Sequence, residues 1–305
     1  MEGAVQGVLF DSPLTGKTKS DKSIMDYPFF ALDRCGRRKR PIEYNDGNVT
    51  VQIKANNGSI ATVYDKDLIL YVAGLMREQM NQGIEPGRTF TFSAYDFMRV
   101  TKRPKNDDSY ERILKMLERL QGTQICTNIE HGGAGVDGFF SWLDSASASY
   151  GSQAGHKKTK YIRVTICEWL YLAIYQGNVL TYDPRYFQLR PLARRLYDIA
   201  RSHCGRQKYW AVKLPKLREK IGFEGELRRL RYEMDQMLQQ SEPIPEYRFR
   251  LINDRNDNFA RHLERDGFRI RPSGRASNQD IVVLFEFIGG RNRDFSEIRK
   301  QLSEL

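Results

Sequence analysis

Long hydrophobic runs are missing from this sequence. Among its 305 residues, no uninterrupted apolar stretch approaches the roughly 20 residues that a membrane-spanning helix requires. The first residues also lack the order of charged, apolar and small residues that marks a secretory signal. We therefore expect a soluble, cytoplasmic protein without a membrane partner.

Cysteine and histidine are scarce as well. The four cysteines are scattered and form no Cys-x-x-Cys pair: Cys35, Cys126, Cys167 and Cys204. This spacing argues against a zinc site and a disulfide framework, so we expect reduced, structural cysteines. The four histidines form no His-x-His pair of the kind that a rolling-circle nickase uses for its metal: His131, His156, His203 and His262. We predict neither a metal nor a cofactor.

Recognisable catalytic motifs are also missing. The segment TGKT at Thr15–Thr18 resembles a phosphate-binding loop, but such a loop needs a glycine five positions before Gly16, where Asp11 stands. No paired carboxylates and no Ser/His/Asp arrangement can be recognised from spacing. We therefore predict that the protein is not an enzyme.

Negative charge is in short supply relative to positive charge. Lysine and arginine number 49 against 38 aspartate and glutamate, which gives a net charge of +11 and a pI near 9.4. Between Arg190 and Arg231, 13 basic residues face four acidic ones, a local charge of 13 − 4 = +9. A phosphate backbone relieves such self-repulsion by replacing small counterions, so the charge favours a nucleic-acid partner.

The segment Thr101–Ile129 predicts an amphipathic helix followed by a strand. Its apolar residues recur at the spacing of one helical face: Ile113, Leu114, Leu117 and Leu120. Asp107, Asp108 or Ser109 can accept the free amides at its start, and Gly122 ends it. The following TQICTNI alternates β-branched and polar residues, as in a half-buried strand.

The same order recurs in Trp210–Gln240. A short helix, a turn at Gly222 and a longer helix precede the alternating strand Tyr247–Ile252. The apolar positions of the two helices are Leu214, Leu217, Ile221, Leu227, Leu230, Met234, Met237 and Leu238. In the earlier copy, FTFSAYDFMRVT supplies the short helix. Helix, turn, helix and β-hairpin is the order of a winged helix, so we predict an α+β fold with two tandem winged-helix domains.

The basic residues around both longer helices are the candidate DNA contacts. In the second copy we expect Arg228, Arg229 and Arg231 near base edges, and Tyr232 of the same helix is a further DNA-binding candidate. Phosphate and wing candidates there are Lys216, Arg218, Lys220, Arg248 and Arg250. In the first copy we expect Arg112, Lys115 and Arg119 as the contacts of the helix, with Lys102, Arg103 and Lys105 on the DNA backbone. Ser109 and Tyr110 are further candidates there. A solvated helix face is the alternative for each charged helix taken alone.

Three segments resemble the replication initiator protein A family of bacterial plasmids. They are DYPFFALDRCGRRKRPIEYNDG from Asp26, IATVYDKDLILYVAGLM from Ile60 and LTYDPRYFQLRPLARRLYDIARSHCG from Leu180, within a match over Ser23–Leu251. The resemblance implies a plasmid-associated bacterial protein whose two winged-helix domains bind origin repeats called iterons. It further implies melting of an AT-rich segment, recruitment of the host helicase machinery, and a homodimer, formed through the first domain, that becomes a monomer to bind iterons.

Two further helices are expected beside these motifs. From Asp65 an acid-capped helix carries the apolar stripe Leu68, Tyr71, Val72, Leu75 and Met76. The later PLARRLYDIARSHCG turns Leu192, Leu196, Ile199 and Ala200 inward. Its arginines remain outside, where they could touch phosphates: Arg194, Arg195 and Arg201.

Composition suggests the domain limits. We expect residues 1–22 to be a disordered tail, residues 23–159 and 160–288 to be the two domains, and residues 289–305 to be a C-terminal tail. The stretch SASASYGSQAGHKKTK from Ser145 is rich in Gly, Ser and Lys and lies either in the first wing or between the domains; the linker is favoured. We expect YIRVTICEWLYLAIY to open the second domain and IVVLFEF to close the second wing.

Three other functions remain as alternatives. A winged-helix transcription repressor ranks second and could coexist with an initiator through autoregulation. A metal-dependent origin nickase and an RNA-binding protein that uses the basic helices rank well behind.

Overall fold

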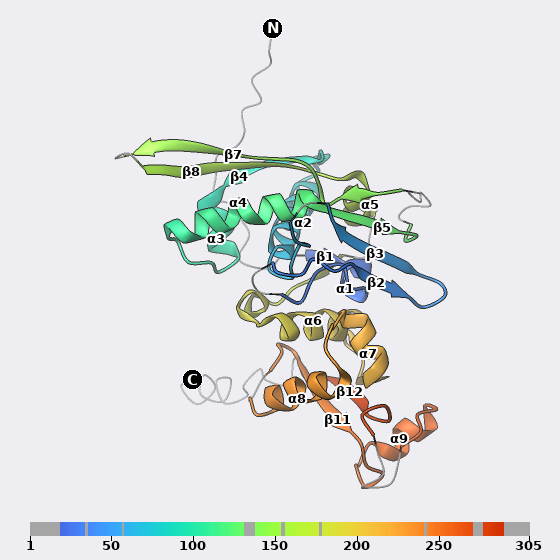
Figure 1. Cartoon of the computed structure of the whole chain (residues 1–305). Helices are drawn as coiled ribbons and strands as arrows, with labels where there is room; N and C mark the ends of the chain where they lie inside the picture. Colours follow the sequence, from blue (N-terminus) through green and yellow to red (C-terminus); the bar gives the residue numbers. More distant parts are fainter. Residues whose placement is uncertain are drawn as a thin grey trace, which may run out of the picture. The chain divides into compact units, whose positions relative to one another are not determined.

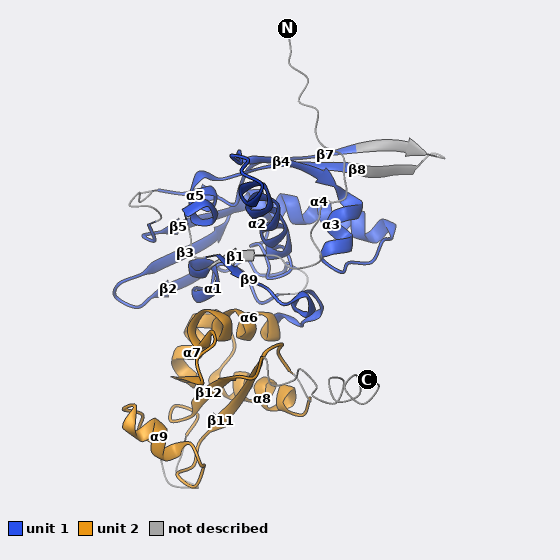
Figure 2. Cartoon of the chain, turned by 180° about the vertical axis from the view of Figure 1, so that it is seen from behind, with its two compact units in different colours: residues 1–191 blue, residues 192–305 orange. Residues whose placement is uncertain are grey.

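A computed structural model describes residues 19–33, 36–56, 58–130, 138–153, 156–176, 179–240, 243–270 and 277–289 (Figure 1). The chain divides into two compact units, Met1–Pro191 and Leu192–Leu305 (Figure 2). Within the described ranges, no helix is both long and apolar enough to cross a membrane. The division falls later than the predicted boundary between residues 159 and 160.

Unit 1 contains a winged helix. Its elements follow in the order α2 (Lys66–Asn81), β4 (Thr89–Ser93), α3 (Ala94–Val100), α4 (Asp107–Gly122), β7 (Leu143–Gln153) and β8 (His156–Ile166). The strands form an antiparallel sheet in the order β4-β8-β7. The β7–β8 hairpin is the wing, and α3 and α4 are the helix-turn-helix pair.

A second sheet in unit 1 has the strand order β2-β3-β5-β6. Its strands are β2 (Ile42–Asn45), β3 (Thr50–Ala55), β5 (Thr123–Thr127) and β6 (Phe140–Ser141). The strand predicted directly after α4 is β5, so its existence is confirmed. It pairs with β3, however, and is not part of the wing.

Of the two places considered for the stretch from Ser145 to Lys160, the favoured linker is wrong and the first wing is correct. Residues 145–153 belong to β7 and residues 156–160 to β8, because β7 pairs with β8 and β8 pairs with β4. The strand and helix expected to open the second domain are β8 and α5 (Glu168–Gln176), and both belong to unit 1.

The ends of unit 1 also differ from the prediction. Residues 19–21, expected in the disordered tail, form β1 (Lys19–Asp21), which pairs with β9 (Val179–Thr181), and α1 (Lys22–Asp26) follows directly. Residues 1–18 of that tail lie outside the described residues. So does the expected C-terminal tail, apart from Gly289.

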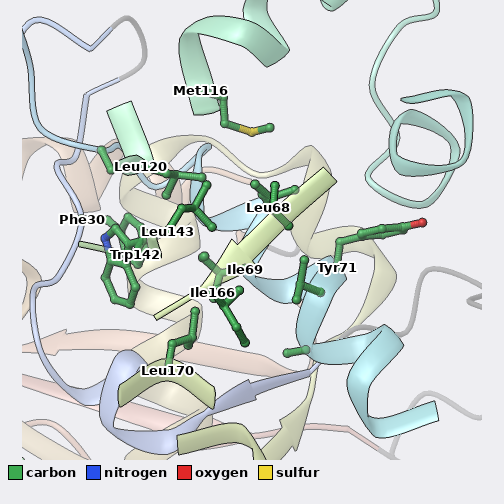
Figure 3. Close-up of a cluster of buried hydrophobic side chains, with 14 of the residues drawn as sticks. Phe30, Leu68, Ile69, Tyr71, Met116, Leu120, Trp142, Leu143, Ile166 and Leu170 are labelled. Carbon is green, nitrogen blue, oxygen red and sulfur yellow. The ribbon is translucent and has the colours of Figure 1, made fainter. Parts of the chain in front are cut away.

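The core of unit 1 holds α4 against α2 (Figure 3). Buried Met116 and Leu120 come from α4, and Leu68 comes from the fully packed first turns of α2. Trp142 stacks on Phe30, with ring centroids 4.7 Å apart. Leu114, predicted on the apolar face of α4, is exposed, and Met116 takes its place in the core.

Unit 2 is the second winged helix, as predicted. Its elements are α6 (Pro191–Ile199), η2 (Ala200–Cys204), β10 (Tyr209–Lys213), α7 (Leu214–Ile221), α8 (Leu227–Leu238), β11 (Tyr247–Ile252), α9 (Ala260–Arg265) and β12 (Val282–Phe287). After η1 (Pro184–Gln188), the chain passes from unit 1 to unit 2 at the first residue of α6, Pro191. The sheet order is β10-β12-β11, and β12 closes the wing as expected.

Candidate nucleic-acid interface

Helix α8 presents a cationic surface from a well-packed position. Gly222 ends α7 with a left-handed φ of 68°, a conformation that glycine adopts without steric cost, and the chain then turns into α8. Buried Leu230 and Met234 fix α8 to the core. Arg228 and Arg229 are exposed on its first turn. Both guanidinium groups are therefore accessible to an anion in solution.

Within the described part of the chain, two of the three α8 arginines form ion pairs, and both pairs lie at the surface. Arg229 Nε lies 2.9 Å from Glu233 Oε1, and Arg231 Nε lies 3.5 Å from Asp235 Oδ2. Both are i,i+4 pairs near the surface, which contribute little and exchange readily for a phosphate. Arg231 also donates to the Asn278 side chain at 3.2 Å. Arg228 carries no ion pair within the described part of unit 2.

The DNA-contact candidates that flank α8 in unit 2 differ in exposure and in their ion pairs. Lys216 pairs with Glu219 at 3.1 Å, and Arg218 and Lys220 are half-buried on α7. On β11, Arg248 is exposed. Arg250 instead pairs with Glu286 at 3.0 Å and stacks on the Phe259 ring at 4.5 Å, so it serves the fold.

The start of α4 corrects two expectations. The N-cap is Asn106, whose side-chain oxygen accepts from the Ser109 amide at 3.1 Å, and not Asp107, Asp108 or Ser109. The Ser109 hydroxyl donates to the same oxygen at 2.8 Å and is buried. Ser109 therefore supports the cap and does not face a ligand.

Arg119 lies inside unit 1. Its Nε and Nη2 donate to the two carboxylate oxygens of Asp65, each at 2.7 Å, and its side chain is only 20% exposed. Burial alone lowers the pKa of Arg119, but the hydrogen bond and charge of Asp65 outweigh it and the net pKa is raised. Asp65 also accepts from Thr62 and does not cap α2 with its side chain. Arg119 therefore anchors α4 to α2 and is not available to a base.

Arg103 has a similar internal role. Its Nη2 donates to the Tyr64 carbonyl at 2.7 Å and to Asp67 at 3.1 Å, and its guanidinium lies 5.3 Å from the centre of the Phe97 ring. These contacts tie the turn between α3 and α4 to the start of α2. The expectation that Arg103 contacts the DNA backbone therefore does not fit its position.

The rest of α4 has a mixed face. Arg112 and Lys115 are exposed, and Arg112 lies 3.8 Å from Asp108. The exposed acidic residues of the same helix outnumber these two cations: Asp107, Asp108, Glu111 and Glu118. Tyr110 packs against the core. The α4 surface is thus less suited to phosphate than the α8 surface.

The turn before α4 and the wing of unit 1 supply further positive charge. Lys102 and Lys105 are exposed, and Lys105 lies 3.9 Å from the centre of the Tyr95 ring. Along β8, the basic residues are His156, Lys157, Lys158, Lys160 and Arg163. The paired strand β7 has Asp144 as its one acidic residue, and β7 glycine and serine stand opposite two lysines at Gly151↔Lys158 and Ser152↔Lys157. The sequence analysis considered the first wing for this stretch but favoured a linker, and it named none of the β8 cations as DNA contacts, although lysines beside small alternating residues were a usable signal.

The arginines of α6 and η2 are internal rather than outward. Arg195 Nη2 donates to the Lys220 carbonyl at 2.7 Å, and its Nη1 lies 3.6 Å from Asp198. Arg201 lies 3.8 Å from Glu246, and Arg194 is buried. The expectation that these three arginines touch phosphates is therefore wrong, and part of the local excess charge belongs to the interior of unit 2.

No group of three potential metal ligands occurs among the residues that the structure describes. The described cysteines are free, and burial raises the pKa of Cys167 to about 12 and that of Cys204 to about 11. Both thiols are therefore neutral near pH 7 and poor nucleophiles.

Comparison with known proteins agrees with this architecture. Residues 19–249 match the family Replication initiator protein A. The chain belongs to that family. The resemblance seen in the sequence is therefore confirmed. One relative is a "Putative replication protein" of Wigglesworthia glossinidia brevipalpis. It is 32% identical to this chain over 243 residues, which cover 75% of this chain and 84% of that protein.

Solved structures share the fold of this family member. A crystal structure of selenomethionine derivatives of domains 2 and 3 of RctB has a TM-score of 0.59 at 13% identity, covering 87% of this chain and 96% of that chain. A second structure of RctB domains 2–3 has a TM-score of 0.51 at 12% identity, with the same coverage. Together with the topology of both units, this confirms the α+β, tandem winged-helix fold.

Proposed function

We propose that the protein is a plasmid replication initiator that binds repeated sites in duplex DNA, with α8 as its main base-reading helix. The observation that carries the proposal is the arrangement of α8. Leu230 and Met234 fix the helix, while Arg228 and Arg229 extend from its exposed side and Arg231 makes only exchangeable contacts. Arginine suits bidentate contact with guanine in the major groove, where the second helix of this motif docks. Tyr232 is exposed on the same helix.

Around α8, a second set of side chains holds the phosphate backbone. Lys216, Arg218 and Lys220 on α7 and Arg248 on the wing are the candidates within unit 2. Contacts of this kind fix register without reading sequence.

Unit 1 contributes mainly backbone contacts in this proposal, because the exposed face of α4 mixes both charges. Lys102 and Lys105 in the turn, Arg112 and Lys115 on α4, and the cations of β8 supply them. Joining two modest DNA-binding units in one chain raises affinity through effective concentration, and repeated sites extend that advantage.

Membership of the replication initiator family supports a role for this protein after DNA binding as well. We infer that the bound protein helps to open an adjacent AT-rich segment, recruits the host helicase machinery, and passes from a homodimer to a monomer before it binds repeats. Permanganate footprinting detects the opening, and a protein that binds without opening is a repressor. A protein-linked 5′ end on supercoiled plasmid in divalent metal would instead indicate a nickase.

Replacing the α8 arginines one at a time tests base reading. Arg228→Ala, Arg229→Ala and Arg231→Ala are each expected to cost roughly 1–3 kcal/mol of binding free energy, confined to one position of the repeat. Lys216→Ala is the matched control, because losing a phosphate contact weakens all sequences alike. Binding is measured by fluorescence anisotropy on duplexes that each carry one altered base pair. Equal losses on every duplex for all three arginine variants would refute their role as readers.

A competition experiment distinguishes duplex-DNA binding from the remaining alternative, RNA binding. Duplex DNA and duplex RNA of the same sequence are compared as competitors at one fixed salt concentration. The proposal expects DNA to compete far better, and equal or better competition by RNA overturns it.

A further inference from the structure

The wing of unit 2 contains an additional folded segment, residues 253–270, which we call the wing module. It lies between β11 and β12 and includes α9 (Figure 1). Ala260 and Leu263 of α9 are buried in one cluster with Ile252, Val282 and Leu284 of the two strands. This packing holds the module against one face of the sheet.

Polar contacts fix the module further. Arg255 donates to the Ile270 carbonyl at 2.9 Å and pairs with Glu264 at 3.1 Å, which joins the two ends of the module. The Tyr209 hydroxyl of β10 donates to Asp266 at 2.8 Å, and this hydrogen bond raises the pKa of Tyr209. The module is thus tied to all three strands of the sheet, to β11 and β12 by apolar packing and to β10 by a hydrogen bond, and presents its surface in a defined position.

Each carboxylate of the module makes a contact that supports the fold. Asp254 accepts from the Asn256 amide at 3.1 Å, and Asp257 accepts from the Phe259 amide at 2.8 Å. Glu264 pairs with Arg255, and Asp266 binds Tyr209. The module has four acidic residues and four arginines, a formal net charge of 4 − 4 = 0, and Glu264 offsets Arg255, while the other three carboxylates keep their charge in hydrogen bonds to neutral donors.

Three of the four arginines of the module extend into solvent. Arg261, Arg265 and Arg269 are exposed, and none makes a hydrogen bond or ion pair within the described part of the chain. Arg261 and Arg265 stand four residues apart on α9, a spacing at which like charges repel. A short helix that keeps two such arginines outward gains stability when an anion approaches it.

We propose that the wing module is a separate contact surface for the phosphate backbone of duplex DNA, formed by Arg261, Arg265 and Arg269. The inference rests on the proposed duplex binding and adds a surface that neither recognition helix nor the hairpin strands provide. Arginine binds phosphate through two parallel N–H donors, and a rigid support limits the entropy lost in doing so. These contacts position the protein and read no base.

The test measures how the affinity of the full chain for a random-sequence DNA duplex depends on salt. Each phosphate contact contributes about −0.9 to the slope of log K against log salt concentration. Arg261→Gln/Arg265→Gln is therefore expected to make the slope shallower by about 2, and Arg269→Gln by about 1. Arg261→Lys/Arg265→Lys keeps both charges and is expected to retain most of the slope.

A matched control removes the same charge elsewhere. Arg185→Gln/Lys54→Gln changes two cations of unit 1 that no part of the proposal uses, so its slope should equal that of the wild type. Circular dichroism verifies that each variant is folded. A wild-type chain that fails to bind the duplex overturns the proposed function itself. Wild-type binding with an unchanged slope in Arg261→Gln/Arg265→Gln overturns only the wing-module inference, as does an equal change in the control.

Discussion

Replacing Arg119 by alanine is expected to destabilise unit 1 by about 3–5 kcal/mol, because a buried carboxylate then loses its only bidentate cation among the described residues. The Asp65 side chain is 2% exposed and, among the residues that the structure describes, keeps the neutral donors of Thr62 alone. Arg119→Lys should fall between alanine and wild type, since an ammonium cannot reproduce both hydrogen bonds. The effect belongs to the anchoring of α4 and not to DNA reading.

Urea unfolding followed by tryptophan fluorescence measures this loss. Trp210 is the one tryptophan of unit 2, so a Trp210→Phe background leaves Trp142 and Trp169 to report on unit 1. Arg112→Ala on the same helix is the control and should change the free energy of unfolding by less than about 0.5 kcal/mol. Equal, small effects for Arg119→Ala and Arg112→Ala would show that the Asp65 pair does not hold the helix.

Arg195→Ala is expected to destabilise unit 2 by a similar amount, about 3–5 kcal/mol. The Arg195 side chain is 3% exposed, lies 3.6 Å from the buried Asp198 carboxylate, and donates to the Lys220 carbonyl at 2.7 Å. The second contact joins α6 to the last turn of α7, just before the Gly222 turn into α8. DNA affinity should therefore fall together with stability.

Hydrogen exchange read by mass spectrometry separates the two units in this experiment. Peptides from α6, α7 and α8 should lose protection in Arg195→Ala, while peptides from α2 and α4 should not. Arg206→Ala, an exposed arginine of unit 2, is the matched control and should leave both sets unchanged. Unchanged protection of α7 in Arg195→Ala would contradict the anchoring role.

The fold was largely predictable because its helices carry their pattern locally. Leu214, Leu217 and Ile221 repeat at helical spacing, and all three are buried in α7 as that spacing requires. A linker was preferred to the wing of unit 1 for the opposite reason. Residues 145–153 are mostly small and polar, and the hairpin is held in its sheet by the pairing of β8 with β4, 76 residues earlier in the chain at Thr89↔Thr165.

The candidate interface was only partly predictable. An arginine on the polar side of a helix has the same sequence pattern whether it faces solvent or a neighbouring element. Arg119 finds its carboxylate 54 residues away in the chain and Arg103 finds one 36 residues away, and helical periodicity carries no information on either pairing. Arg228 and Arg229, by contrast, were correctly expected outside the apolar face. Their contact with DNA stays a prediction.

Site-specific photo-crosslinking tests most directly whether α8 enters the groove of a repeat. A benzophenone amino acid replaces Tyr232, whose side chain is 63% exposed on α8, and in a control it replaces Ile84, which is 51% exposed in unit 1. The account predicts crosslinks from position 232 to bases inside the repeat, abolished by excess repeat duplex, and none to those bases from position 84. Crosslinks from position 232 that are absent, or spread evenly over flanking sequence, would contradict it.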